Sequence, residues 1–218
     1  MRFLRNNGLS LVMFGMFAVM LVGHSCSGYI EHNNDLAERG QSHIEFSPYL
    51  RSGAFVESVF ENWESEFLQM AAYVLLTIWL RQKGSPESKK LHGKEPEDED
   101  PRLHQHDPNA PWAVRQGGVI LAVYKHSLSI TLLLLFVASF VVHAMGGTAD
   151  ANDHLRAGET HLTVFDYMTS AKCWFESFQN WQSEFLSVGV LVVLQIWLRQ
   201  IGSPESKAVA APHDFTGH

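Results

Sequence analysis

Residues 62–89 read NWESEFLQMAAYVLLTIWLRQKGSPESK, and residues 180–207 read NWQSEFLSVGVLVVLQIWLRQIGSPESK. Nineteen of these 28 positions are identical at a fixed offset of 118 residues. A period this long exceeds that of solenoid repeats, so it indicates duplication of a whole structural unit. Weaker matches continue upstream and pair His43 with His161, Tyr49 with Tyr167 and Ser52 with Ser170. The sequence therefore predicts two tandem copies of one unit.

Each predicted unit contains two apolar stretches. Residues 9–22 and 128–142 carry no charge, and weakly polar neighbours extend each to roughly 18 residues, close to the ~20 that cross a bilayer. Residues 67–80 and 185–198 are also uncharged, but their 14 residues cover only about 21 Å of helix. We interpret all four as membrane spans, because the helices extend past the uncharged limits. The predicted fold is an all-α integral membrane protein with four transmembrane helices, arranged as two parallel tandem repeats of two helices each.

These spans define the expected domain organisation. Residues 1–89 and 117–207 form the two repeats, each with two spans joined by an outer loop. We expect the spans at about 9–26, 63–82, 127–146 and 181–200. Residues 90–116 are acidic and rich in proline, a composition that cannot bury a core, so they are expected to form a flexible cytoplasmic linker. Residues 208–218 are expected to be a disordered tail.

The basic residues set the expected orientation. Arg2 and Arg5 before the first apolar stretch resemble the start of a signal peptide. The repeat partner at residues 128–146 is internal, so we interpret the first stretch as an uncleaved anchor. With both termini inside, twelve of the 16 lysines and arginines fall on the inner side, as the positive-inside rule requires. We therefore expect a multi-pass protein of the bacterial inner (plasma) membrane with cytoplasmic N- and C-termini.

The repeated Asn-Trp-x-Ser-Glu-Phe-Leu motif supplies the candidate site. On a helix, polar residues of the first copy fall close to one face, and the second copy repeats the pattern. The residues on this face are Asn62, Glu66, Tyr73 and Thr77, and their partner positions are Asn180, Glu184, Leu191 and Gln195. Ser65 and Ser183 of the motif complete the candidate site. Carboxylates inside a membrane usually face a bundle interior or a hydrated cavity. Parallel repeats would bring Glu66 and Glu184 together across a pseudo-twofold axis.

Two interpretations of this motif remain open. The functional one is a carboxylate pair, Glu66 and Glu184, that binds a proton, a cation or a cationic ligand. The structural one is that the Asn, Ser and Glu side chains cap the start of the helix. The second copy has Gln182 where the first has Glu64, so only Glu66 and Glu184 persist in both copies.

Residues at the two ends of the shorter spans have the character of interface anchors. Tryptophan is enriched at both membrane surfaces, and basic residues mark the inner boundary. The expected anchors are Trp63, Trp181, Trp79, Trp197, Arg81 and Arg199. After them, Gly84 and Gly202 are suited to ending a helix, and the prolines that follow prevent its continuation.

Metal, haem and catalytic chemistry receive little support. His24 and His143 are repeat-related and could act as axial ligands of a haem, but strict metal-ligand spacings are lacking. We therefore assign no cofactor, no metal and no catalytic residue. Cys26 and Cys173 are not repeat-equivalent, and a disulfide between them is left open. The net charge of −7 provides no basic surface for nucleic acid.

The paired Asn-Trp-Glu-Ser-Glu-Phe-Leu-Gln and Asn-Trp-Gln-Ser-Glu-Phe-Leu motifs, together with Arg-Asn-Asn-Gly-Leu-Ser near the start and Lys-His-Ser-Leu-Ser before the third span, carry a family resemblance. The chain resembles a bacterial family of four-helix, two-repeat integral membrane proteins known only as a domain of unknown function. The resemblance covers residues 1–207. It implies a membrane protein and implies no activity, substrate or catalytic residue.

Three functions are therefore weighed. The leading hypothesis is a non-enzymatic structural, interaction or envelope-stress component that contacts the lipid bilayer and a second copy or another membrane protein. The alternative is a small proton- or cation-coupled transporter or channel that uses Glu66 and Glu184. A weaker alternative is a redox subunit that holds haem between His24 and His143.

Overall fold

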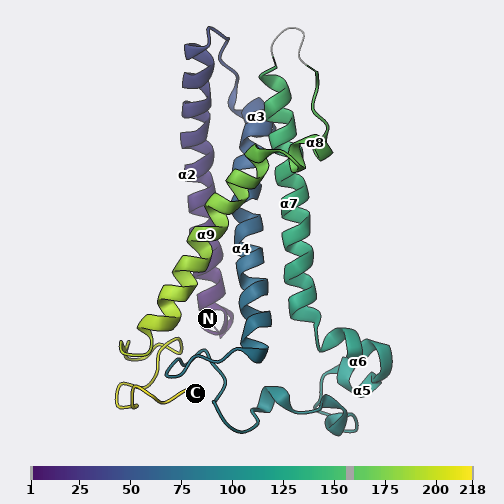
Figure 1. Ribbon diagram of the computed structural model, residues 1–218, viewed down its shortest axis with the longest axis vertical. Coiled ribbons are helices and arrows are strands. Elements are labelled where there is room, and N and C mark those ends of the chain that lie inside the picture. The colour runs from purple at the N-terminus through teal and green to yellow at the C-terminus, as the bar shows by residue number, and fades with distance from the viewer. Residues whose placement is uncertain (1, 156–159, 218) are drawn as a thin grey trace. The chain divides into compact units, whose positions relative to one another are not determined.

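The computed structural model describes residues 2–155 and 160–217, so residues 156–159 of the second expected outer loop lie outside the described part. Within the described residues every regular element is a helix, and the predicted all-α class is confirmed. Four helices are long (Figure 1): α2 (Gly8–Glu38), α4 (Gly53–Trp79), α7 (Ser127–Asp153) and α9 (Ala171–Leu194). The shorter ones are α1 (Arg2–Asn6), α3 (Phe46–Tyr49), η1 (Pro96–Asp98), η2 (Pro101–His104), α5 (Trp112–Gln116), α6 (Gly118–Tyr124) and α8 (Val164–Met168).

Two of the long helices, not four, are apolar enough to cross a membrane by length and composition. These are α2, with 31 residues, and α7, with 27. Helices α4 and α9 have 27 and 24 residues, but the polar side chains of the repeated motif lie inside them. Only the C-terminal half of each is apolar. The expectation of four apolar spans is therefore corrected for α4 and α9.

The helices also begin and end at places that the hydrophobic pattern does not mark. Helix α2 continues to Glu38, well past the expected end near residue 26. Helix α4 begins at Gly53, ten residues before the expected start at residue 63. The residues before the motif and the apolar stretch after it are thus one continuous helix in each copy. As a result, the repeated motif lies in mid-helix and not at a helix start.

The chain divides into two compact units. The first contains Met1–Phe60 and Val142–Ser170, and the second contains Glu61–Val141 and Ala171–His218. Helices α4 and α7 run from one unit into the other, so each unit combines segments that are far apart in the sequence.

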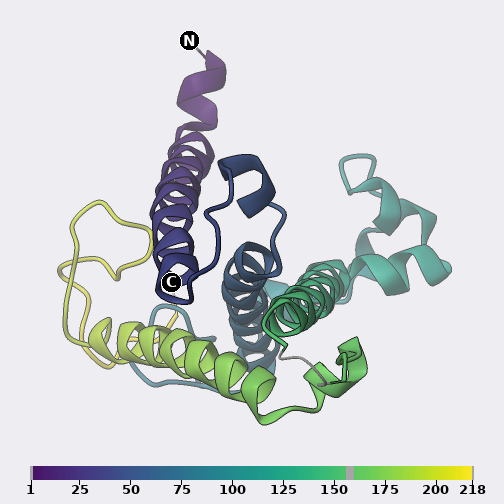
Figure 2. The ribbon, with the colours of Figure 1, turned by 90° about the horizontal axis from the view of Figure 1, so that it is seen from above.

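Close backbone approach holds the first unit together. A Cβ atom on Gly53 of α4 would lie 2.6 Å from the carbonyl oxygen of Gly146 in α7, so the two helices meet where neither has a side chain. The ring of Tyr167 from α8 is 1% exposed and covers Gly147. Seen from above, α3 lies next to α2 and the start of α4 (Figure 2), and the Tyr49 ring packs there over Gly28.

An asparagine closes the loop at the end of both α2 and α7. The side-chain oxygen of Asn33 accepts from the backbone N–H of Ile44 at 2.9 Å, and its amide donates to the Ile44 carbonyl at 3.2 Å. Asn152 makes the same two bonds to Leu162, at 2.8 and 3.0 Å. Each asparagine thereby satisfies both backbone groups of one residue in the returning chain.

In the second unit, the segments after α4 and after α9 fold in the same way. The backbone N–H of Gln82 donates to the Ser88 hydroxyl at 2.9 Å, and that of Gln200 donates to the Ser206 hydroxyl at 2.9 Å. Gly84 and Gly202 have φ angles of 85° and 83°, in the left-handed region that a glycine adopts without strain. The two copies of Leu-Arg-Gln-x-Gly-Ser-Pro-Glu-Ser-Lys therefore make equivalent turns.

The C-terminal tail, for which we expected disorder, makes specific contacts. The ammonium group of Lys207 is buried and donates to the carbonyls of Pro212, His213 and Phe215 at 3.4, 2.9 and 3.2 Å. Burial lowers the pKa of the Lys207 ammonium, and the nearby Arg199 guanidinium adds to this effect. The Thr216 hydroxyl accepts from the backbone N–H of Gly84 at 2.9 Å, so the tail lies against the loop that follows α4.

The acidic linker is also more structured than its composition suggests. It contains η1, η2 and α5, and Lys89 forms an ion pair with Asp98. Hydrogen bonds from Lys89 and from the backbone of Glu95 hold the pKa of the Asp98 carboxyl below its usual value.

Candidate functional site

A buried carboxylate lies at the centre of the repeated motif in the second unit. Glu64 in α4 is 0% exposed. Its Oε1 atom accepts a hydrogen bond from the Ser177 hydroxyl at 2.7 Å and another from the Trp181 indole N–H at 3.2 Å. Both donors belong to α9, so this carboxylate ties the two motif-bearing helices together. Polar contacts of this kind join helices in a membrane, where an unpaired carboxylate is costly.

An aromatic cluster surrounds this contact. The Trp181 ring packs edge-on against Phe136 of α7 and Phe178 of α9, with ring centroids 6.1 and 5.5 Å apart. Trp174 extends the cluster toward Phe140. Trp181, expected as an interface anchor, therefore has an internal role as a hydrogen-bond donor and a packing residue.

Glu66 and Glu184, the expected site residues, lie elsewhere. Glu66 is exposed and Glu184 half-buried. The two carboxylates are close enough for their charges to interact, so the structure does bring them near each other. They lie apart from the hydrogen bonds that Glu64 makes, because residues 64 and 66 point about 200° apart around a helix.

The remaining motif residues do not cap a helix. The Ser65 hydroxyl donates to the Asn62 carbonyl at 2.7 Å, and the Ser183 hydroxyl donates to the Asn180 carbonyl at 2.8 Å. These are bonds within the turn of a continuing helix. The capping interpretation is therefore wrong, because α4 and α9 begin upstream at Gly53 and Ala171.

The two arginines just after the C-terminal ends of these helices bond to their own backbone. Nη1 of Arg81 donates to the carbonyls of Ile78 and Leu80 at 3.1 and 3.2 Å, and Arg199 makes the equivalent bonds at 3.2 and 2.8 Å. The guanidinium thus satisfies carbonyls that the helix end leaves open. Trp79 and Trp197 are exposed at this end, and Trp63 is half-buried in the middle of α4.

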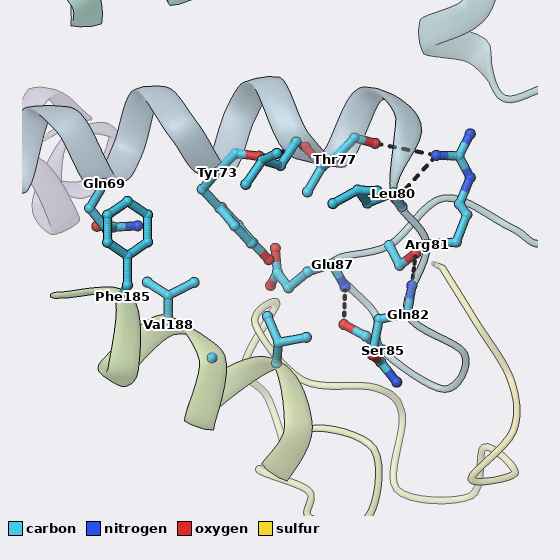
Figure 3. Close-up of a pocket in the computed structure, with 14 residues that line it drawn as sticks. Gln69, Tyr73, Thr77, Leu80, Arg81, Gln82, Ser85, Glu87, Phe185 and Val188 are labelled. Atoms are coloured by element: carbon cyan, nitrogen blue, oxygen red, sulfur yellow. Dashed lines mark hydrogen bonds between the residues drawn. The ribbon is translucent and has the colours of Figure 1, made fainter. Parts of the chain in front are cut away.

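A cavity of about 390 Å³ opens beside the C-terminal half of α4 (Figure 3). Its walls come from α4, α9 and the loop after α4, and they are largely apolar. Tyr73 points its hydroxyl toward the carboxylate of Glu87, and the two groups interact electrostatically. Gln195, just beyond α9, donates to Oε1 of Glu87 at 3.5 Å and to the Glu205 carbonyl at 2.9 Å. Tyr73 and Thr77 of the predicted polar face therefore line this cavity, and Gln195 bonds to Glu87, another lining residue.

The first unit contains a second buried carboxylate. The Tyr167 hydroxyl donates to Oε1 of Glu57 at 2.6 Å, and a Glu57 oxygen lies within 4.8 Å of a ring nitrogen of His143. His143 is 0% exposed and its ring packs edge-on against Tyr167. Carboxylate and imidazole are both ligands that divalent metals accept, so Glu57 and His143 could supply two ligands to such an ion.

The histidines and cysteines considered above have separate surroundings. His24 is exposed, and its Nε2 shares a 3.0 Å hydrogen bond with the Ser58 hydroxyl, while His143 is buried against Tyr167. Cys26 and Cys173 are both reduced thiols, the first exposed and the second buried.

Sequence reasoning missed Glu57, Glu64 and Glu87. Glu64 was set aside because the second copy has glutamine, and Glu87 was treated as part of a helix stop. The signal that could have identified Glu64 is its position on the helix. Residues 64 and 66 lie on nearly opposite faces, so one of the two glutamates is expected to face the neighbouring helix. Glu57 lies upstream of the motif, in the part of α4 that the apolar pattern does not mark.

These features define an all-helical protein with two candidate membrane helices and buried carboxylates between helices. The chain belongs to the family described as domain of unknown function DUF6766, whose family model matches residues 1–218. Neither a curated protein nor a solved structure matches the chain.

Proposed function

We propose that this protein is a non-enzymatic scaffold of the bacterial inner membrane, with its N- and C-termini in the cytoplasm. Helices α2 and α7 cross the bilayer outward, and the more polar helices α4 and α9 return the chain to the cytoplasmic side after each of them. Its role is structural: it presents loops to a second copy or to another membrane protein.

The observation that carries this proposal is the exposure of large apolar side chains along α2 and α7. Phe14, Val19 and Met20 of α2 are 73%, 66% and 65% exposed, and Leu134 of α7 is 64% exposed. Large exposed apolar side chains that follow one another along a helix mark contact with lipid or with another protein. Helices of 31 and 27 residues extend about 46 and 40 Å, more than the ~30 Å hydrocarbon core.

The buried polar contacts favour a scaffold. The Glu64 carboxylate is used to join α4 and α9, as polar residues do between membrane helices. Reporter fusions test the topology, because alkaline phosphatase is active only outside the cytoplasm and a fluorescent protein fluoresces only inside it. Each reporter is inserted in turn at both sites. At residues 34–43 only the phosphatase should be active, and at residues 90–95 only the fluorescent protein should give a signal. The opposite pattern, or fluorescence at both sites, would contradict the proposed topology.

A second candidate function rests on the pair of Glu66 and Glu184. The two carboxylates of the second unit lie close enough for their charges to interact, as a proton- or cation-coupled site requires. Proteoliposomes with an internal pH dye would test it. Proton flux that disappears in Glu66→Gln/Glu184→Gln, but not in Glu97→Gln of the linker, would favour transport. Equal traces for liposomes with and without protein would leave the scaffold as the function.

A further inference from the structure

Three ionisable side chains lie buried together in the first unit. Glu57 of α4 is 8% exposed, His143 of α7 is 0% exposed and Tyr167 of α8 is 1% exposed. Ionisable groups buried in a membrane protein are costly and usually serve a ligand or an ion. We propose that Glu57 and His143 bind a divalent transition-metal ion such as Zn²⁺, and that Tyr167 holds the carboxylate in place for it. This metal site is independent of the scaffold role proposed above.

The two ligand groups are close enough to share one ion. A carboxylate oxygen of Glu57 and a ring nitrogen of His143 lie within 4.8 Å of each other. A tetrahedral ion with bonds of about 2.0–2.2 Å joins ligand atoms roughly 3.5 Å apart, so a small rotation of the Glu57 side chain covers any difference. These residues fill two of the four positions around such an ion, and water or further side chains fill the others.

The backbone of α4 and α7 holds the two ligands at this separation. A Cβ atom on Gly146 of α7 would lie 2.5 Å from the backbone nitrogen of Glu57, so the two helices touch at the position of the carboxylate ligand. Gly146 follows His143 at i, i+3, a spacing that places both on the same face of α7. The ligands are therefore carried by helices in direct contact, and rigid elements position a metal site more precisely than loops do.

Tyr167 contacts both ligands. Its hydroxyl donates to Oε1 of Glu57 at 2.6 Å, and its ring packs edge-on against the ring of His143. Carboxylates that bind metals are usually held by an outer hydrogen bond of this kind, and loss of that bond weakens metal binding about 10–100-fold. Tyr167 is therefore a positioning residue of the site.

The ligand types select the class of ion. Imidazole nitrogen suits Zn²⁺, Co²⁺, Ni²⁺ and Cu²⁺, whereas Ca²⁺ and Mg²⁺ prefer sites made of oxygen. Glu57 and His143 also make further interactions in the protein. Metal binding displaces protons from its ligands, so the ion takes the place of a proton within these interactions. Because the two ligands come from different helices, local ligand spacing in the sequence could not reveal them.

Titration of the metal-stripped, full-length protein with Co²⁺ in detergent tests the site. Bound Co²⁺ should acquire visible d–d absorption that saturates at equal amounts of ion and chain. Zn²⁺ should displace it and remove the absorption, and an excess of Ca²⁺ or Mg²⁺ should not. Absorption no stronger than that of Co²⁺ in buffer would overturn the proposal. A thiolate-to-Co²⁺ charge-transfer band would place the ion on Cys26 or Cys173 and would also overturn it.

Variants assign the ligands. Glu57→Gln and His143→Gln should each abolish the Co²⁺ absorption. His24→Gln is the matched control and should bind Co²⁺ as the wild type does, because His24 is repeat-related to His143 but exposed. Tyr167→Phe should raise the Kd for Co²⁺ at least about ten-fold and keep the wild-type absorption maximum at saturation, which a general loss of folding would not produce. An unchanged Kd in Tyr167→Phe would refute its positioning role.

X-ray absorption spectroscopy of the Zn²⁺-loaded wild type needs no variant, so it decides the question even if Glu57→Gln and His143→Gln fail to fold. The spectrum should show nitrogen and oxygen neighbours with the scattering pattern of an imidazole ring. Neighbours without imidazole, or with sulfur, would exclude the pair of Glu57 and His143 as the metal site.

Discussion

Replacing Ser177 with alanine removes the hydroxyl that donates the 2.7 Å hydrogen bond to the buried carboxylate of Glu64. Bonds to carboxylates contribute about 1.5–3 kcal/mol, and the cost is at the upper part of that range when the acceptor stays buried. We therefore expect Ser177→Ala to lower the free energy of unfolding by about 2 kcal/mol. For a chain of 218 residues this corresponds to a fall of roughly 4–8 °C in Tm.

The assay is thermal unfolding in detergent, with Ser183→Ala as the control. The Ser183 hydroxyl is exposed and donates only to a carbonyl of its own helix, so its removal should change Tm by less than about 1 °C. Trp181→Phe removes the longer 3.2 Å bond and also part of the indole that packs against Phe136 and Phe178, so a loss of at least about 1 kcal/mol is expected. In a Glu64→Met background the effect of Ser177→Ala should nearly vanish. Equal Tm values for Ser177→Ala and Ser183→Ala would refute the role of Glu64 as the link between α4 and α9.

Three further outcomes are expected. Gly147→Ala would push a methyl group into the buried ring of Tyr167, so the free energy of unfolding should fall by about 1–3 kcal/mol. Gly23→Ala is the control, because Gly23 has open space around it and the added methyl group should not destabilise the protein. Lys207→Met removes the ammonium that holds three tail carbonyls, so limited proteolysis should cleave residues 208–217 faster; an unchanged cleavage rate would contradict the ordered tail. Hydrogen bonds from the side chain and the backbone of Thr163 lower the pKa of the Asp166 carboxyl in the folded protein. The ionised carboxylate therefore stabilises the fold at pH values above the unfolded-state pKa of ~3.9. This stabilisation is lost as the pH falls through the lower folded-state pKa. The Tm difference between wild type and Asp166→Asn should therefore be constant from pH 7 to 5 and shrink below about pH 4, and a difference that persists at low pH would exclude this contribution.

Hydrophobic patterning predicted the existence of the long helices but not their limits. The apolar residues in α2 end near residue 26, yet Tyr29 and Asn33 continue the helix because they pack on or bond to the returning chain. The start of α4 at Gly53 depends on its close approach to Gly146, which is 93 positions away and leaves no local signal. Tertiary contacts therefore set both boundaries.

The sequence predicted which motif contains the candidate site, but not which of its residues make the contacts. Helical periodicity placed Glu66 on a polar stripe with Tyr73 and Thr77, and Tyr73 does line a cavity. The pattern could not show that Ser177 and Trp181 face Glu64, because their pairing crosses two copies that differ at this position. The role of Glu87 depends on the fold of the loop after Gly84, which local sequence signals only as a stop.

Asn33 and Asn152 close the loops that follow α2 and α7, so the position of the returning chain does not depend on the length of each loop. Because Asn33 fixes Ile44 by two hydrogen bonds, residues 34–43 do not determine where α3 begins. Lengthening an enclosed loop costs only about 0.6 kcal/mol per doubling of its length. Residues 39–43, which follow the end of α2, are therefore a natural place for an inserted epitope or spectroscopic tag that leaves α2 and α3 undisturbed.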